Sequence, residues 1–114
     1  MTPLLYILML SLSSSVSWLS PKNQDVGAIA AGHPYRTHFI YRNTGTDSVA
    51  IDNVRTSCGC TVPDWSRHPL PPGQSDTLHV VLEKNNRGRF RQKIKVFFSH
   101  QRRADVLFLR GIVE

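Results

Sequence analysis

The sequence predicts an all-β domain, an immunoglobulin-like antiparallel β-sandwich of about seven strands, preceded by an N-terminal signal peptide. Beyond Pro21, no segment places apolar residues at the i, i+3, i+4, i+7 spacing of an amphipathic helix over three turns. Short segments of alternating apolar and polar residues recur instead, bounded by turn residues, as half-buried strands require. Without its first twenty residues the 114-residue chain keeps about 94, close to the roughly 100 typical of this fold.

The first twenty residues have the character of a signal peptide, so the expected domain boundaries are 1–20 and 21–114. Residues 4–12 read LLYILMLSL, a run too short for the ~20 residues of a membrane span but suited to the apolar core of a signal peptide. Ser15 and Ser17 favour cleavage after Ser17, with Ser20 as the alternative. No Lys or Arg precedes Leu4, which leaves an uncleaved anchor or a buried strand as the other interpretation. The predicted location is periplasmic or secreted.

The strands are expected in the following order. A short strand at 26–29 precedes one that begins after Pro34, where Phe39 and Tyr41 share the buried face. The third strand spans 49–54, and Asp52-Asn53 interrupts its alternation, which indicates a bulge or a switch of sheets. The later strands are expected at 77–82, 90–98 and 106–113, separated by turns at 85–88 and 99–103.

The segment from Cys58 to Gly73 is the least regular part of the chain. Proline cannot donate to a strand ladder, and this segment carries four prolines, so it is expected to be mostly loop, with Trp65 packed onto the edge of the sandwich. The prolines are Pro63, Pro69, Pro71 and Pro72.

The charge is basic, with 14 Lys and Arg against 8 Asp and Glu. Arg87, Arg89 and Arg91 alternate, and on one strand they would form a cationic stripe that Lys93 and Lys95 extend. The favoured interpretation is a solvated strand face that resists aggregation. An anionic glycan or a lipid headgroup is the alternative ligand, and inferred export argues against nucleic acid.

Ser57-Cys58-Gly59-Cys60-Thr61-Val62-Pro63 resembles the signature of a bacterial domain-of-unknown-function family of exported proteins. Its members are similar to the immunoglobulin-like domains of the Hydin and major-sperm-protein type. Flanking segments match the family in order, and Val26 stands where an aromatic residue is usual. The matching segments are 25–29 followed by Gly32, 39–45, 54–55, 72–75, 88–90 and 109–113. The resemblance implies the fold and export but no activity. Related eukaryotic domains look like scaffolding and protein-binding modules, an analogy at the level of fold.

Cys58 and Cys60 are the only constellation with chemistry to test, and three interpretations stay open. They are small buried side chains at a strand end, or a redox pair whose disulfide closes a small ring with an unusual Cα separation. Arg55 and Arg67 would favour a thiolate in that pair. The third interpretation is a Cu(I) or Zn(II) site formed by the two thiolates, for which His68 is the nearest further ligand.

The sequence therefore predicts a non-enzymatic protein-binding or scaffolding module of the cell envelope, with Trp65 and Arg67 as partner-binding residues. The expected partner is an unidentified envelope protein; nucleic acid and cofactors are not expected, and peripheral contact with a membrane is left open. The alternative is redox or soft-metal handling through Cys58 and Cys60.

Overall fold

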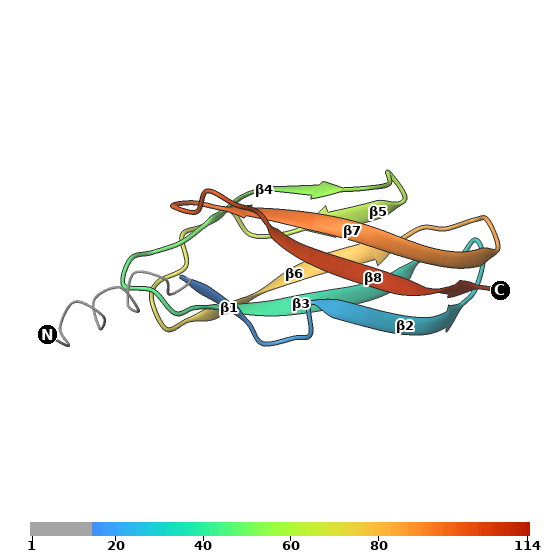
Figure 1. Cartoon of the computed structure of the whole chain (residues 1–114), viewed down its shortest axis with the longest axis horizontal. Coiled ribbons are helices and arrows are strands. Elements are labelled where there is room, and N and C mark those ends of the chain that lie inside the picture. Colours follow the sequence, from blue (N-terminus) through green and yellow to red (C-terminus); the bar gives the residue numbers. More distant parts are fainter. Residues whose placement is uncertain (1–14) are drawn as a thin grey trace, which may run out of the picture.

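The computed structural model describes residues 15–114 as two four-stranded sheets packed face to face (Figure 1). One sheet has the strand order β1-β3-β6-β5 and the other the order β2-β8-β7-β4. The strands are β1 (Val16–Trp18), β2 (Asn23–Ile29), β3 (Tyr35–Asn43), β4 (Ile51–Thr56), β5 (Thr61–Asp64), β6 (Ser75–Leu82), β7 (Gly88–Phe98) and β8 (Asp105–Val113). This architecture confirms the predicted immunoglobulin-like sandwich. Within residues 15–114 no helix is long and apolar enough to span a bilayer.

The core lies between the two sheets and comes from the alternation seen in the sequence. Phe39 on β3 and Leu78, Val80 and Leu82 on β6 have no exposed surface, and Ile94 on β7 meets them from the other sheet. Side chains at alternate positions of a strand point to one face. The second half of β3, the second half of β6 and most of β7 accordingly bury every second residue.

The fold has eight strands where about seven were expected, and β5 is one of those that the sequence missed. Pro63 lies inside β5, although the segment was expected to be mostly loop because of its prolines. β5 is the edge of its sheet and pairs with β6 on one side only. An edge strand accommodates proline, because the missing N–H can face away from the neighbouring strand.

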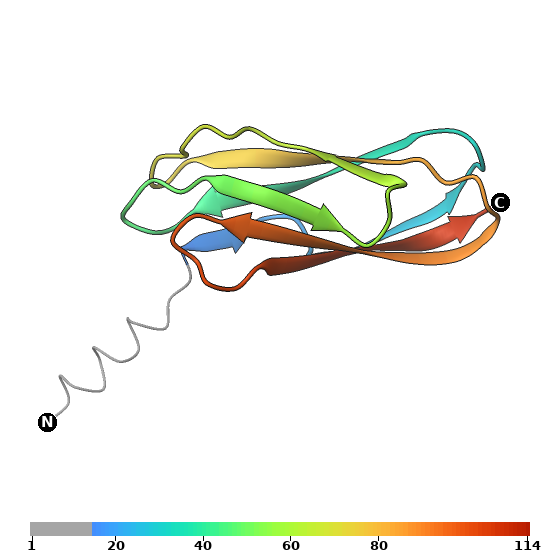
Figure 2. The ribbon, with the colours of Figure 1, turned by 90° about the horizontal axis from the view of Figure 1, so that it is seen from above.

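β1 is the other strand that was missed, and it lies within the segment expected to be a signal peptide. Its residues pair with β3, from Val16 opposite Asn43 to Trp18 opposite Tyr41. The expected cleavage after Ser17 lies inside β1, and the alternative cleavage after Ser20 lies on its C-terminal side. The apolar run at 4–12 lies outside the described residues, and the boundary between 1–20 and 21–114 stays a prediction. Two views place β1 and the C-terminus at opposite ends of the sandwich (Figures 1 and 2).

Two irregularities shape the sheet β2-β8-β7-β4. Its register shifts between Ile51 and Asn53, so of the two alternatives expected at Asp52-Asn53 the structure has the bulge and not the switch of sheets. A second shift lies in β2 at Gly27, whose φ is 73°, and β2 runs parallel to β8, so this sheet is mixed rather than antiparallel throughout. Periodicity reports which residues are buried but carries no information on strand direction.

Candidate functional site

Cys58 and Cys60 are joined by a disulfide in the connection between β4 and β5. The turn is closed by hydrogen bonds to Cys58: its carbonyl accepts from the Thr56 hydroxyl at 2.9 Å and from the Thr61 N–H at 3.1 Å. The Cys60 N–H also points at the Cys58 sulfur, 3.1 Å away. Both cysteines are half-buried, so the disulfide lies at the surface rather than in the core.

The Cα atoms of the two cysteines are 5.1 Å apart. This lies inside the usual disulfide range of about 4.4–6.8 Å, so the expected departure in Cα separation is not found. The physical reason is the turn at Gly59, which bends the chain and brings residues i and i+2 closer than an extended strand would.

Lys84 is the cation beside the disulfide, with its Nζ 3.8 Å from the Cys60 sulfur. Neither arginine that the sequence suggested fills this role. The Arg55 guanidinium lies over the Phe97 ring and the Arg67 guanidinium over the Trp65 ring. Lys84 is separated from Cys60 by 24 residues and arrives through the pairing of β5 with β6, which no local pattern indicates.

The oxidation state of Cys58 and Cys60 bears on the predicted metal site, because the two sulfurs are joined in a disulfide. A disulfide offers no thiolate, and thiolate is the form of cysteine that binds soft metals. No group of three or more His, Cys, Asp and Glu side chains suited to a metal is found within residues 15–114. Metal binding by Cys58 and Cys60 therefore stays a prediction for the reduced protein.

Trp65 and Arg67 lie together just beyond the other end of β5. The indole packs against the core and donates from Nε1 to the Ile51 carbonyl at 3.3 Å, which confirms its expected place on the edge of the sandwich. The exposed Arg67 guanidinium lies 5.1 Å from the centre of the indole ring. The four residues of β5 separate this pair from the disulfide by about 13 Å, so the candidate residues form two sites along one strand.

Comparisons with known proteins agree on the architecture. A family model described as "Protein of unknown function (DUF1573)" matches residues 18–113. PapD-like (ASH) domain 7 of human CEP192 superposes with a TM-score of 0.71 and 11% identity, over 90% of this chain and 87% of that one. WR4, a C. elegans MSP family member, gives 0.56 and 8%, over 90% and 100%. None of the curated proteins matches the sequence.

A longer chain matches as well. The Vibrio cholerae VesB protease superposes with a TM-score of 0.67 and 13% identity, over 96% of this chain and 34% of the protease. This chain thus spans about a third of the protease. At such low identities these likenesses show the fold alone.

Proposed function

Because this chain belongs to the DUF1573 family of proteins of unknown function, its role has to be argued from its surface, and we propose a non-enzymatic protein-binding or scaffolding module of the cell envelope. The apolar run at 4–12 supports export. The indole, guanidinium and disulfide along β5 offer binding contacts rather than a pair for proton transfer.

The observation that carries the proposal is the Trp65–Arg67 pair. Tryptophan and arginine are among the residues most enriched at the energetic centres of protein interfaces. The hydrogen bond from Trp65 to Ile51 fixes the indole before any partner arrives. A side chain that is already ordered loses less conformational entropy on binding, which favours affinity.

The partner is expected to contact side chains rather than to add a strand to β5. Strand addition needs a regular row of backbone donors and acceptors on the free edge. Pro63 has no N–H, and the Thr61 N–H is already bonded to the Cys58 carbonyl. The free edge of β5 therefore lacks the backbone donors that a strand of another protein would need for pairing.

The test uses the full chain with a photoreactive residue at position 67, followed by identification of the cross-linked protein. Affinity for that purified protein is then compared between wild type, Arg67→Ala and the control Arg42→Ala. Arg42 is an exposed arginine on β3, two strands away from β5. Arg67→Ala is expected to weaken binding about tenfold, an effect of roughly 1.4 kcal/mol. Equal affinities for the two variants would reject this surface. Trp65 is unsuitable for the test, because its substitution would also disturb the core.

A second candidate function is disulfide exchange, and the specific observation in its favour is the Lys84 ammonium 3.8 Å from the Cys60 sulfur. A partner thiolate attacks the Cys58 sulfur, the disulfide breaks, and Cys60 leaves as a thiolate stabilised by Lys84. A second thiolate of the partner then attacks the partner's sulfur in the mixed disulfide and releases Cys58. The partner dithiol is oxidised to a disulfide, and Cys58 and Cys60 are reduced.

Rates of reduction by a small dithiol measure this role. Lys84→Gln is expected to slow the reduction several-fold at neutral pH, while Lys22→Gln, which alters an exposed lysine elsewhere, leaves it unchanged. Identical rates for both variants would remove Lys84 from the proposal. Titration of the reduced protein with Cu(I) and Zn(II) tests the soft-metal alternative in the same experiment.

A further inference from the structure

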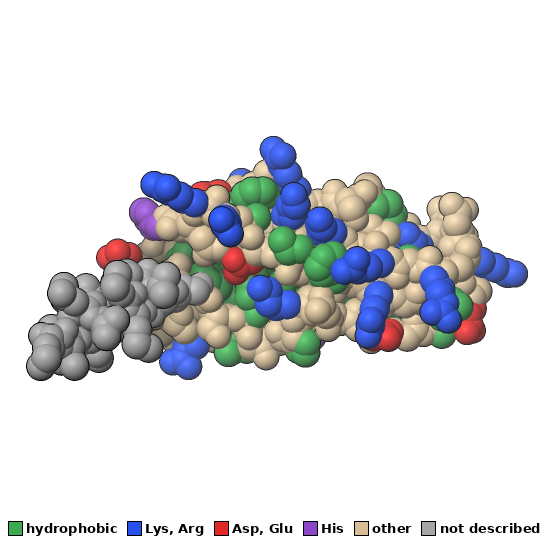
Figure 3. Space-filling view, in the orientation of Figure 1, with side chains coloured by type: hydrophobic (Ala, Val, Ile, Leu, Met, Phe, Trp, Pro, Cys, Tyr) green, Lys and Arg blue, Asp and Glu red, His purple; other side chains and the backbone are tan. Residues whose placement is uncertain are grey.

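The outer face of the sheet β2-β8-β7-β4 carries a concentration of positive charge. The exposed basic side chains of β4, β7 and β8, which we call the basic face, are Arg55, Arg89, Arg91, Lys93, Lys95 and Arg110. In Figure 3, basic side chains gather over the region where β7 and β8 run and outnumber acidic ones there. The predicted stripe on β7 is thus one part of a wider surface that also uses the neighbouring strands.

The basic face places like charges directly opposite one another. Arg91 on β7 is the register partner of Arg110 on β8, and Lys95 is the partner of Arg55 on β4. Like charges opposite each other across a sheet disfavour folding. Within residues 15–114 one ion pair relieves this repulsion, at 3.6 Å between Arg110 Nε and Asp25 Oδ2. The remaining charge is available to an anionic ligand.

Aromatic rings hold two of the guanidinium groups against the sheet. Arg91 lies over the Phe108 ring, 4.1 Å from its centre, and Arg55 lies over the Phe97 ring at 5.8 Å. A stacked guanidinium keeps its N–H groups free at the edge of its plane, where they match a carboxylate or sulfate with two parallel hydrogen bonds. These two arginines are therefore ordered in advance for an anion.

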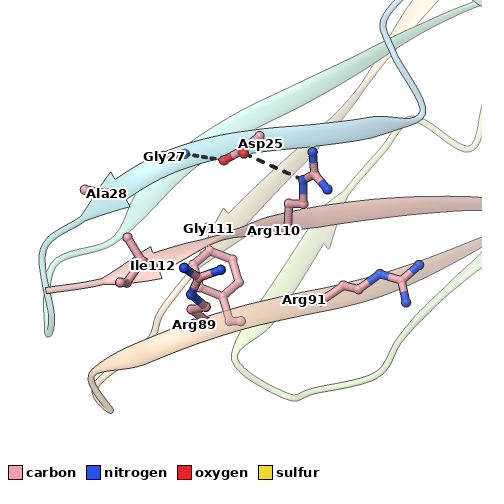
Figure 4. A pocket seen from close by; sticks show the side chains of 9 residues that line it. Asp25, Gly27, Ala28, Arg89, Arg91, Arg110, Gly111 and Ile112 are labelled. Carbon is pink, nitrogen blue, oxygen red and sulfur yellow. Dashed lines mark hydrogen bonds and ion pairs between the residues drawn. The ribbon is translucent and has the colours of Figure 1, made fainter.

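The charges are arranged in a line with a hollow at one end. Arg89, Arg91, Lys93 and Lys95 occupy alternate positions of β7, so they repeat about every 6.7 Å along the strand. A shallow depression of about 560 Å³ lies at the Arg89 end, between β7, β8 and the bulge of β2. Figure 4 shows Arg89 and Arg91 on one side of it and the Arg110–Asp25 pair on the other.

We propose that the basic face binds a linear acidic polysaccharide that carries carboxylate or sulfate groups. The line of evenly spaced cations along β7 suits a polymer with regularly repeated negative charges, and the hollow accommodates a sugar ring beside Arg89 and Arg110. The binding groups are the guanidinium and ammonium groups of the basic face, and the affinity arises from ion pairing with release of counterions.

The same surface is less suited to other polyanions. Proteins that bind single-stranded nucleic acid stack bases on open aromatic faces, whereas Arg91 and Arg55 already cover Phe108 and Phe97. A membrane-binding face combines cations with apolar side chains that enter the lipid. Within residues 15–114 three large apolar residues are exposed, and two of them, Leu19 and Val62, lie outside the basic face. The third, Ile112, lies opposite Arg89 and lines the hollow, where one such side chain offers little apolar surface for insertion into lipid.

The experiment measures binding of the full chain to heparin, a sulfated polysaccharide, and to polygalacturonate, a carboxylated one, by calorimetry at several salt concentrations. The double variant Arg91→Gln/Lys93→Gln is compared with Arg36→Gln/Arg42→Gln, which removes the same charge from exposed positions of β3 on the other sheet. The first variant is expected to bind at least tenfold more weakly. The plot of log K against log salt has a negative slope, and its magnitude is expected to fall by about two, one for each cation removed. The control is expected to change affinity less than twofold.

Several results would overturn the proposal. They are the absence of binding to both polysaccharides at low salt, an equal loss in the two double variants, and tighter binding of single-stranded DNA or anionic vesicles. Preference for heparin or for polygalacturonate identifies the anionic group. Arg67→Ala is expected to keep full polysaccharide affinity, so failure of this proposal and failure of the protein-binding proposal are distinguishable.

Discussion

The indole Nε1 of Trp18 donates a hydrogen bond of 2.7 Å to Oδ2 of Asp105, which links β1 to β8 in the other sheet. The Trp18 ring also contacts three aromatic rings of the core, at centroid distances of 6.4 Å from Phe39, 5.4 Å from Tyr41 and 5.9 Å from Phe98. A strand of three residues at a sheet edge has few backbone hydrogen bonds of its own. The partly buried side chain of Trp18 and the buried side chain of Val16 therefore help to keep β1 in place.

A chain that begins at Pro21 is expected to be less stable than one that begins at Val16. It loses the buried side chain of Val16 together with the indole of Trp18 and its hydrogen bond to Asp105. Removal of a fully buried aromatic side chain costs about 3–5 kcal/mol, and the partly buried indole is expected to account for less than that. Urea denaturation of the two chains measures the difference, and Trp18→Ala in the longer chain is expected to reproduce part of it, because Val16 and the pairing of β1 with β3 remain. Equal unfolding midpoints would mean that β1 adds nothing to the domain. Sequencing of the N-terminus of the protein produced in bacteria tests the proposed export and shows whether processing retains this strand.

Gly111 packs against the bulge of β2, and Gly111→Ala is expected to destabilise the domain. A Cβ at this position would lie 2.6 Å from the Gly27 carbonyl oxygen and 3.0 Å from Phe90 Cζ, so backbone must move. Overpacking of this kind costs about 1–3 kcal/mol. Gly59→Ala is the matched control, because nothing lies within 4 Å of the added Cβ. Thermal unfolding checks the pair, and a stable Gly111→Ala variant would show that β2 can shift at no cost.

Tyr41 gives the domain a predicted loss of stability in alkali. Burial, and secondarily the nearby Asp76 carboxylate, raises the pKa of Tyr41 from 10.0 to about 12. Below pH 10 the phenol is protonated in both states and stability does not depend on it. Between pH 10 and pH 12 the unfolded chain loses this proton first, so folding weakens as the pH rises, by up to about 3 kcal/mol.

Denaturation at a series of pH values, compared with Tyr41→Phe, measures this contribution. The variant has no phenol, so its stability is expected to fall less over the same interval. If the wild type and the variant follow the same curve, Tyr41 does not supply the alkaline transition. The phenolate absorbance of the folded wild type gives an independent reading of the raised pKa.

The comparison of sequence with structure separates local signals from long-range ones. The alternation around Phe39, Leu78 and Ile94 predicted the buried faces, because each residue reports its own burial through its polarity. The sequence around each of the two missed strands pointed to another structure. β1 follows the apolar run that indicated a signal peptide, and β5 contains Pro63, which indicated a loop. Lys84 beside Cys60 and the parallel pairing of β2 with β8 depend on strand order, which single residues do not report.

Among the candidate site residues, the sequence predicted the location of Trp65 but not its neighbours. A tryptophan in a proline-rich segment needs an apolar surface, and the edge of the sandwich provides one. Its hydrogen bond to the Ile51 carbonyl joins the segment that follows β5 to β4 of the other sheet. The same limit applies to the basic face, where the charges on β7 were visible as an alternation and their like-charged partners Arg110 and Arg55 were not.

Asn43 is a buried polar side chain that holds three segments together at the end of β3. Its Nδ2 donates to the carbonyls of Asp47 and Leu70, each at 2.8 Å, and its Oδ1 accepts from the Gly45 N–H at 2.9 Å. The side chain has no exposed surface, so no water replaces these partners. Asn43→Ala is expected to cost about 3 kcal/mol, because it leaves buried backbone groups without a hydrogen bond.

Asn43→Asp provides the sharper test, because it keeps the shape and removes the donor. At neutral pH the carboxylate faces the Leu70 and Asp47 carbonyls, both acceptors, and a buried charge without a donor is strongly unfavourable. In acid the carboxyl group is protonated and can donate one of the two lost hydrogen bonds. The stability of this variant relative to wild type is therefore expected to improve as the pH falls, whereas Asn43→Ala keeps a constant deficit. A constant deficit in both variants would contradict the hydrogen-bonding role of Nδ2.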